Sequence, residues 1–280
     1  WWDYGFECIR EGDHPTVADN FQVGYRLAGN VLMSQNESEI ISLLIARELE
    51  KPFNDKGEFK GEVRDILIKH IGEEKTNELE EVFKNPASYK NEVLNNPDRY
   101  HPRADDIHPE NVKYAKTMGL LSWESVDTLA ELYRDLSLEL DLRIKYLAAD
   151  SRLFPFSARQ TGIFYAPAKL SGHRVDESQG MRTPVDFYSI KYVTNDGREF
   201  DSPEDVPPGL SIQDYKMHYK PMFYNSTFYK IMVGYSGSDI GLGEGVPSLS
   251  RDNRQLQQAQ PLPAWNMSHF KLSYRTAYYN

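Results

Sequence analysis

The chain has 280 residues, of which 40% are hydrophobic, so it can bury a sizeable core and lacks the composition of a disordered protein. Its 42 acidic and 32 basic residues give a formal net charge of -10, which argues against nucleic acid as a main partner. No apolar run approaches the roughly 20 residues of a membrane-spanning helix. The single cysteine, Cys8, excludes an internal disulfide framework and a Cys-based zinc site.

The first half of the sequence has the apolar spacing of helices, over residues 34–145. Ser34, with Glu37 three residues later, predicts a capping box at the start of the first helix. Ser122 predicts the N-cap of a long amphipathic helix. The prolines of residues 85–109 indicate an irregular connection or short helical turns. The predicted helices cover residues 34–49, 62–71, 73–84 and 122–140.

Short aromatic and β-branched runs replace the helical pattern after residue 141. Asn195-Asp196-Gly197 is a hairpin signal. A further helix is predicted over residues 219–233, before a glycine-rich loop at 234–245. The predicted strands are Ile144–Ala149, Gly162–Ala166, Phe187–Val193 and Phe270–Tyr278. Since no linker clearly divides the halves, we predict an α+β fold in which a mainly helical core, residues 1–145, packs with a β-rich part, residues 146–280.

The adjacent tryptophans at the start of the chain are its least ordinary feature, because Trp1 and Trp2 are half of the four tryptophans present. One interpretation is a hydrophobic anchor. The other is a polar pocket, because indole N–H groups only donate and the Asp3 carboxylate only accepts hydrogen bonds. Together these groups can bind a hydroxyl, while the ring faces contact a neighbouring methyl. Such a pocket rejects a ligand that lacks the hydroxyl.

Trp1-Trp2-Asp3-Tyr4-Gly5 resembles the signature pentapeptide of the catalytic subunit of oligosaccharyltransferase. The stretch from His14 to Asn20 resembles the segment after the pentapeptide in this family. The segment from Trp265 to Arg275 is similar to the closing strand of archaeal members. The chain therefore resembles the soluble C-terminal domain of an archaeal enzyme, and the lack of an initiator Met leads us to expect a piece of a longer polypeptide.

The resemblance implies a glycosyltransferase that moves an oligosaccharide from a lipid carrier to the Asn of Asn-X-Ser/Thr in an acceptor polypeptide. Trp1, Trp2 and Asp3 would bind the Ser/Thr hydroxyl. The family's divalent metal, Mn²⁺ or Mg²⁺, is held mainly by acidic residues of a transmembrane domain outside this sequence. We therefore expect a membrane protein whose soluble domain faces the extracytoplasmic side, and a fragment that is inactive alone, with no catalytic or metal-binding residue of its own.

A second family motif adds a side chain to the hydroxyl pocket, usually after a strand. Asp150 is the best placed match here, but the expected Lys is missing and Arg159 is the candidate substitute. The alternative is an Asp that ends a strand in a turn. His14 and Asn20 are candidates for facing the donor phosphate, although an ordinary turn histidine fits His14 equally well.

Other interpretations stay open at this point. The 18 Tyr and 13 Phe would suit a non-catalytic glycan-binding module, and the many carboxylates would suit a hydrolase with paired acids. A Pro-rich acidic loop also contains metal-ligand types, which are more often solvated than metal-bound. These loop residues are His101, Asp105, Asp106 and His108.

Overall fold

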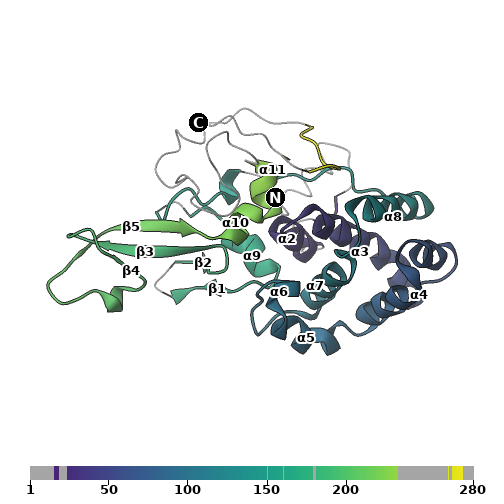
Figure 1. Ribbon diagram of the computed structural model, residues 1–280, viewed down its shortest axis with the longest axis horizontal. Coiled ribbons are helices and arrows are strands. Elements are labelled where there is room, and N and C mark those ends of the chain that lie inside the picture. Colours follow the sequence, from purple (N-terminus) through teal and green to yellow (C-terminus); the bar gives the residue numbers. More distant parts are fainter. Residues whose placement is uncertain are drawn as a thin grey trace. The chain divides into compact units, whose positions relative to one another are not determined.

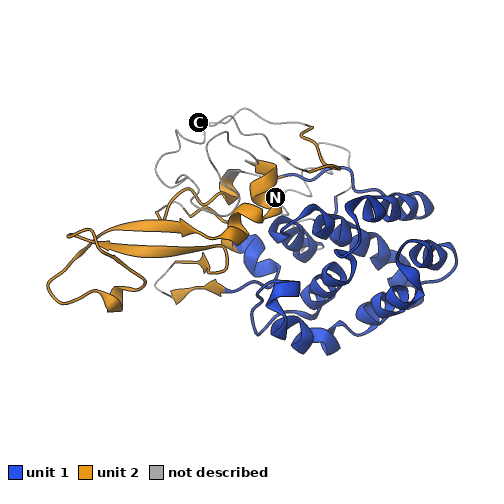
Figure 2. Ribbon diagram, viewed as in Figure 1, with its two compact units in different colours: residues 1–148, 166–174 blue, residues 149–165, 175–280 orange. Residues whose placement is uncertain are grey.

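The computed structural model describes residues 16–18, 24–149, 151–159, 161–178, 181–232, 264 and 267–273. The predicted α+β class is confirmed, with helices in the first part of the chain and strands in the later part (Figure 1). The chain divides into two compact units (Figure 2). Unit 1 comprises residues 1–148 and 166–174, and unit 2 comprises residues 149–165 and 175–280. In the described ranges, no helix combines the length and the apolar character that a membrane span requires.

Unit 1 is a helical body in which α3 packs against α2, α7 and α8, while α4 packs against α7 and α8. Leu49, Leu67, Leu129 and Leu136 in these helices are fully buried. Burying one such side chain stabilises the fold by about 1.5–3 kcal/mol. The helices are α2 (Tyr25–Met33), α3 (Glu37–Lys56), α4 (Glu62–Lys84), α5 (Lys90–Asn95), α6 (Pro97–Tyr100), α7 (Pro109–Leu121), α8 (Val126–Glu139) and α9 (Tyr165–Leu170), with a 3-10 turn at Pro86–Tyr89.

Two helix starts differ from the prediction. The first long helix, α3, is capped by Asn36, whose side-chain oxygen accepts from the Glu39 backbone N–H at 3.0 Å, and Ser34 instead ends α2. Likewise Ser125 caps α8, and Ser122 ends α7. Small polar residues suit either end of a helix, and α2 and α7 were not among the predicted segments.

The other helical predictions in this part of the chain hold. The helices predicted on either side of residue 72 are present, and they join within α4 at a kink where Gly72 has φ 80° and ψ 163°. A glycine is needed there because this backbone conformation is costly for other residues. Short helical turns connect residues 85–109, as the prolines indicate.

Unit 2 is organised by aromatic rings. Phe154, Phe164, Phe187, Phe223 and Phe228 are at most 2% exposed, and the ring centroids of contacting pairs lie 5.2–5.9 Å apart. The described strands form two antiparallel sheets, one of order β4-β3-β5 and one that pairs β1 with β2. The elements are β1 (Val175–Asp176), β2 (Thr183–Pro184), β3 (Tyr188–Thr194), β4 (Glu199–Phe200), β5 (Ile212–Tyr219), α10 (Pro221–Asn225) and α11 (Thr227–Met232), with 3-10 turns at Ser151–Leu153 and Pro203–Asp205.

The strand over Phe187–Val193 and the hairpin after it are confirmed as β3 and its turn into β4, where the Gly197 N–H donates to the Thr194 carbonyl at 2.9 Å. The strand β5 was not predicted. Its last residue, Tyr219, was assigned to a helix over 219–233, which is instead two short helices, α10 and α11. Pro221 ends β5 and starts α10, because it starts a helix well and cannot continue a strand ladder. Ser226, with φ -59° and ψ 142°, then separates α10 from α11.

Two predicted strands are wrong. Ile144–Ala149 forms no strand, and at its first residue the Tyr133 hydroxyl both donates to the Ile144 carbonyl and accepts from the Ile144 N–H, each at 2.8 Å. Those are the two groups that a strand ladder would use. Gly162–Ala166 is a turn that leads into α9, with Gly162 at φ 59°. Of the predicted closing strand, residues 270–273 are not in a strand and residues 274–278 lie outside the described residues.

Candidate functional site

Most of the residues predicted to bind substrate fall outside the part of the chain that the structure describes. They are the three residues of the hydroxyl pocket, the two donor-phosphate candidates and the acid of the second motif: Trp1, Trp2, Asp3, His14, Asn20 and Asp150.

Arg159, the candidate partner of the second motif, is described. Its guanidinium contacts the Asp214 carboxylate of β5 at 3.1 Å, and both side chains are largely exposed. Exposed ion pairs of this kind contribute little stability, so Arg159 can exchange Asp214 for another anion. The strand that was expected before Asp150 is absent, and a 3-10 turn at Ser151–Leu153 follows that position. The strand predicted immediately before the second motif is therefore wrong.

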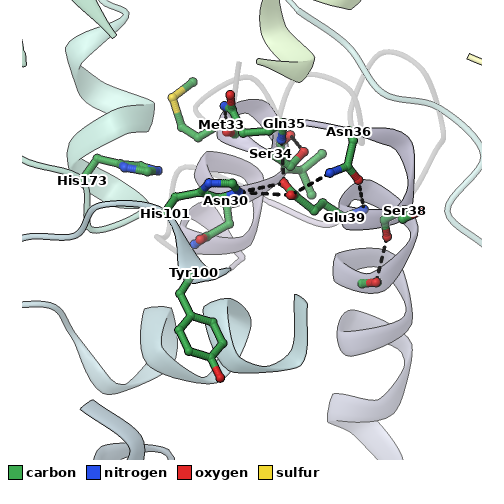
Figure 3. Close-up of polar contacts among 12 residues, drawn as sticks. Asn30, Met33, Ser34, Gln35, Asn36, Ser38, Glu39, Tyr100, His101 and His173 are labelled. Atoms are coloured by element: carbon green, nitrogen blue, oxygen red, sulfur yellow. Dashed lines mark hydrogen bonds and ion pairs between the residues drawn. The ribbon is translucent and has the colours of Figure 1, made fainter. Parts of the chain in front are cut away.

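A histidine–carboxylate contact in unit 1 joins Glu39 and His101 (Figure 3). The imidazole Nε2 lies 3.1 Å from both carboxylate oxygens. The same carboxylate accepts from the Gln35 backbone N–H at 2.6 Å and from the Asn36 side-chain amide at 2.8 Å. Its lone pairs are therefore largely used within the protein. This arrangement anchors the loop at His101 to the start of α3.

His101 also has an unusual backbone, with φ 62° and ψ 157°. This region is essentially restricted to glycine, and another residue held there costs about 1–3 kcal/mol. The imidazole contact with Glu39 helps to offset that cost. Strained residues of this kind are frequent at functional sites, so His101 is a candidate functional residue.

A second polar cluster lies beside this contact. The buried Arg103 guanidinium donates to the Ser171 carbonyl at 2.6 Å, to the Asn30 side chain at 3.3 Å and to His173 Nε2 at 3.3 Å. Asn111 donates to the Leu170 carbonyl at 2.9 Å. Burial, reinforced by the positive charge of Arg103, holds the pKa of His173 well below its usual range. The imidazole is therefore neutral and accepts from Arg103, and the cluster fixes the chain after α9 to α2 and α7.

The Pro-rich loop does not assemble as a metal site. His101 is engaged by Glu39, and His108 accepts from the Glu110 backbone N–H at 3.2 Å at the start of α7. Asp105 and Asp106 are exposed. Over the described ranges, no three His, Cys, Asp or Glu side chains lie close enough together to hold a metal ion.

One buried acid has a strongly perturbed pKa. Glu48 of α3 is 0% exposed, and Ser137 of α8 donates to its Oε1 at 2.6 Å. Its Oε2 has no hydrogen-bond partner among the described residues. Burial raises the pKa of Glu48 to about 7, although the nearby hydroxyls of Ser137 and Tyr133 oppose the shift. A carboxyl that titrates near neutral pH between two helices makes their packing sensitive to pH.

In comparisons with known proteins, no protein-family model matches the chain, and no curated protein or solved structure is significantly similar to it.

These polar clusters were not among the predicted sites. Glu39 lies three residues after Asn36, which is the spacing of a capping box and was a usable signal. No comparable local signal marked the others, because His101 is 62 residues from Glu39 and Arg103 is 73 residues from Asn30. Such pairs form only when the helices pack.

Proposed function

We propose that this chain is the acceptor-recognition domain of an oligosaccharyltransferase, which transfers a lipid-linked oligosaccharide to the Asn of Asn-X-Ser/Thr. The observation that carries the proposal is the pentapeptide Trp1-Trp2-Asp3-Tyr4-Gly5. Five consecutive matched positions that include two tryptophans are a specific signal. Glycosyl transfer and an extracytoplasmic location in the full-length membrane protein belong to this proposal.

The chemistry of the pentapeptide fits recognition of a hydroxyl. The Trp1 and Trp2 indoles donate to the hydroxyl oxygen, and the Asp3 carboxylate accepts its proton. A bound hydroxyl would give all three polar groups a partner at once. An acceptor with Ala at this position leaves them without partners, which costs more than the loss of one contact.

A glycan-binding module is the alternative, and the burial of the aromatic rings counts against it. Such a module stacks sugars on exposed rings, whereas the aromatic cluster of unit 2 is nearly inaccessible to solvent. Among the described residues, the large aromatic side chains that are clearly exposed are Trp123, Tyr146 and Tyr215. These three rings alone make a weaker argument than the pentapeptide.

The resemblance also implies Mn²⁺ or Mg²⁺ in the full-length enzyme. The described residues do not include a group of acids and histidines that would hold such an ion. The proposed contribution of this chain is to bind and orient the acceptor, with the metal ligands in the transmembrane domain.

The test compares acceptor peptides that differ only at the third position of the sequon, using the full-length protein and a lipid-linked oligosaccharide donor. We expect kcat/KM to be about fourfold higher for Thr than for Ser, because a buried methyl contributes on the order of 0.8 kcal/mol. An Ala peptide should react at least about 10- to 150-fold more slowly than the Ser peptide, because one lost hydrogen bond to a charged group already costs roughly 1.5–3 kcal/mol and the two indole donors lose their partner as well.

Asp3→Ala should lower kcat/KM on the Ser peptide by a similar factor and reduce its advantage over the Ala peptide. Asp13→Ala, which removes the same charge outside the pentapeptide, is the matched control and should keep the wild-type order of peptides. A wild-type enzyme that accepts the Ala peptide within a few-fold of the Ser peptide would exclude the hydroxyl pocket.

A further inference from the structure

The outer edge of the three-stranded sheet in unit 2 is exposed. In the order β4-β3-β5, the strand β5 lies at one end, and within the described ranges no strand pairs with its outer side (Figure 1). Gln213, Asp214, Tyr215 and Lys216 are four consecutive exposed residues of β5. Both faces of this half of the strand are therefore open to solvent, because successive side chains point to opposite faces.

The pairing of β5 with β3 determines which backbone groups point outward. The Lys220 N–H donates to the Phe187 carbonyl at 2.8 Å, and the strands then pair Tyr188 with Tyr219 and Tyr192 with Tyr215. Hydrogen-bonded and non-hydrogen-bonded pairs alternate in an antiparallel ladder. Tyr215 therefore belongs to a non-hydrogen-bonded pair, and it directs its N–H and carbonyl away from β3. The outer edge can form a further ladder centred on this residue.

The charges beside Tyr215 favour one particular partner. Asp214 and Lys216 precede and follow Tyr215 in the strand. Their side chains share one face of the sheet, and the Tyr215 side chain points to the other face. If a second copy of β5 pairs antiparallel with the first, with Tyr215 opposite Tyr215, each Asp214 lies opposite the Lys216 of the other copy. We propose that the β5 edge is a self-association surface, through which two copies of this chain form a continuous six-stranded sheet with two-fold symmetry.

Charged residues usually protect an edge strand, because a row of lysines repels an approaching strand. Here opposite charges stand two positions apart, so self-pairing converts them into attractive cross-strand pairs. Their present partners do not prevent this. Asp214 contacts Arg159 at 3.1 Å and Lys216 contacts Glu199 at 2.7 Å, and all four side chains are substantially exposed. Such pairs exchange readily. Tyr215, 40% exposed, adds a ring at the centre of the interface.

Sedimentation velocity of the 280-residue chain over a range of concentrations tests the proposal. We expect a weak dimer with Kd on the order of 10 μM or weaker, since one pair of strands forms a small interface. Asp214→Lys and Lys216→Asp each place like charges opposite one another and should weaken the dimer roughly 5- to 30-fold. The double variant Asp214→Lys/Lys216→Asp restores opposite charges and should recover most of the wild-type affinity.

Asp55→Lys is the matched control, because it makes the same charge change at an exposed residue of α3 in unit 1 and should leave the dimer unchanged. Hydrogen exchange gives a second readout, since the amides of Tyr215 and Met217 should slow as the dimer forms. A chain that stays monomeric at every concentration overturns the proposal. A dimer whose affinity ignores both single variants, or a monomer whose β5 edge binds an extended peptide instead, also overturns it.

Discussion

Replacing Glu48 by Gln should remove a destabilising charge that the folded chain carries at neutral and higher pH. Glu48 is completely buried between α3 and α8, and Ser137 donates to one of its oxygens. A Gln side chain has nearly the same shape and can accept the same hydrogen bond through its carbonyl oxygen. The substitution therefore changes the charge of the site while preserving its packing.

The size of this stability change follows from the pKa of Glu48, which burial raises from its ordinary 4.5 to about 7 in the folded chain. The folded chain holds the Glu48 proton more tightly than the unfolded chain does. The free energy of unfolding of the wild type therefore falls as pH rises from about 4.5 to about 7, and it levels off above pH 7. A rise from 4.5 to about 7 corresponds to about 3 kcal/mol of stability, most of which is lost between pH 5 and pH 8.

The assay is urea unfolding followed by far-ultraviolet circular dichroism, which reports mainly on the helices of unit 1. The stabilisation of Glu48→Gln relative to the wild type should be about 2–3 kcal/mol larger at pH 8 than at pH 5. Subtracting the wild type at each pH cancels the other titrating groups. A pH-independent difference between the two proteins would refute the assignment of a raised pKa to Glu48.

Glu50→Gln provides a control on the same helix. Burial alone would raise the pKa of Glu50, but Lys113 and the Tyr114 hydroxyl, each 2.6 Å from its Oε1, lower it further than burial raises it. A lowered pKa in the folded chain contributes stability above the ordinary pKa, which is lost only as pH falls. Glu50→Gln should therefore destabilise the chain by nearly equal amounts at pH 5 and pH 8.

Two further predictions concern backbone and packing in unit 1. His101→Gly should be about 1–3 kcal/mol more stable than His101→Ala, because both lose the contact with Glu39 but only glycine relieves the positive φ; equal melting temperatures would exclude the strain. Gly119→Ala should destabilise the chain by about 1–3 kcal/mol, because the added Cβ would lie 2.3 Å from Cε1 of the buried Tyr100 ring. Urea unfolding would measure this, and a stabilised variant would show that the usual preference of helices for alanine prevails.

The helices of unit 1 show which features of a helix the spacing of apolar residues predicts. Apolar residues at helical spacing identified the segments that became α3, α4 and α8, because a helix that buries one face must repeat that pattern. The predicted starts of α3 and α8 were wrong, since Ser34 and Ser122 can satisfy either end of a helix and here end α2 and α7. The run Ile144–Ala149 was predicted as a strand, yet the Tyr133 hydroxyl binds both backbone groups of Ile144.

The sequence by itself determined the α+β class, the helical spacing of the first half and the Asn195-Asp196-Gly197 hairpin, because these features depend on residues a few positions apart. It also carries the Trp1-Trp2-Asp3 chemistry on which the proposed function rests. Only the tertiary structure decided that Glu48 meets Ser137, 89 residues away. Contacts over such separations depend on how the helices pack, which no local pattern encodes, and the same packing removes the water that would otherwise keep the pKa of Glu48 at its ordinary value.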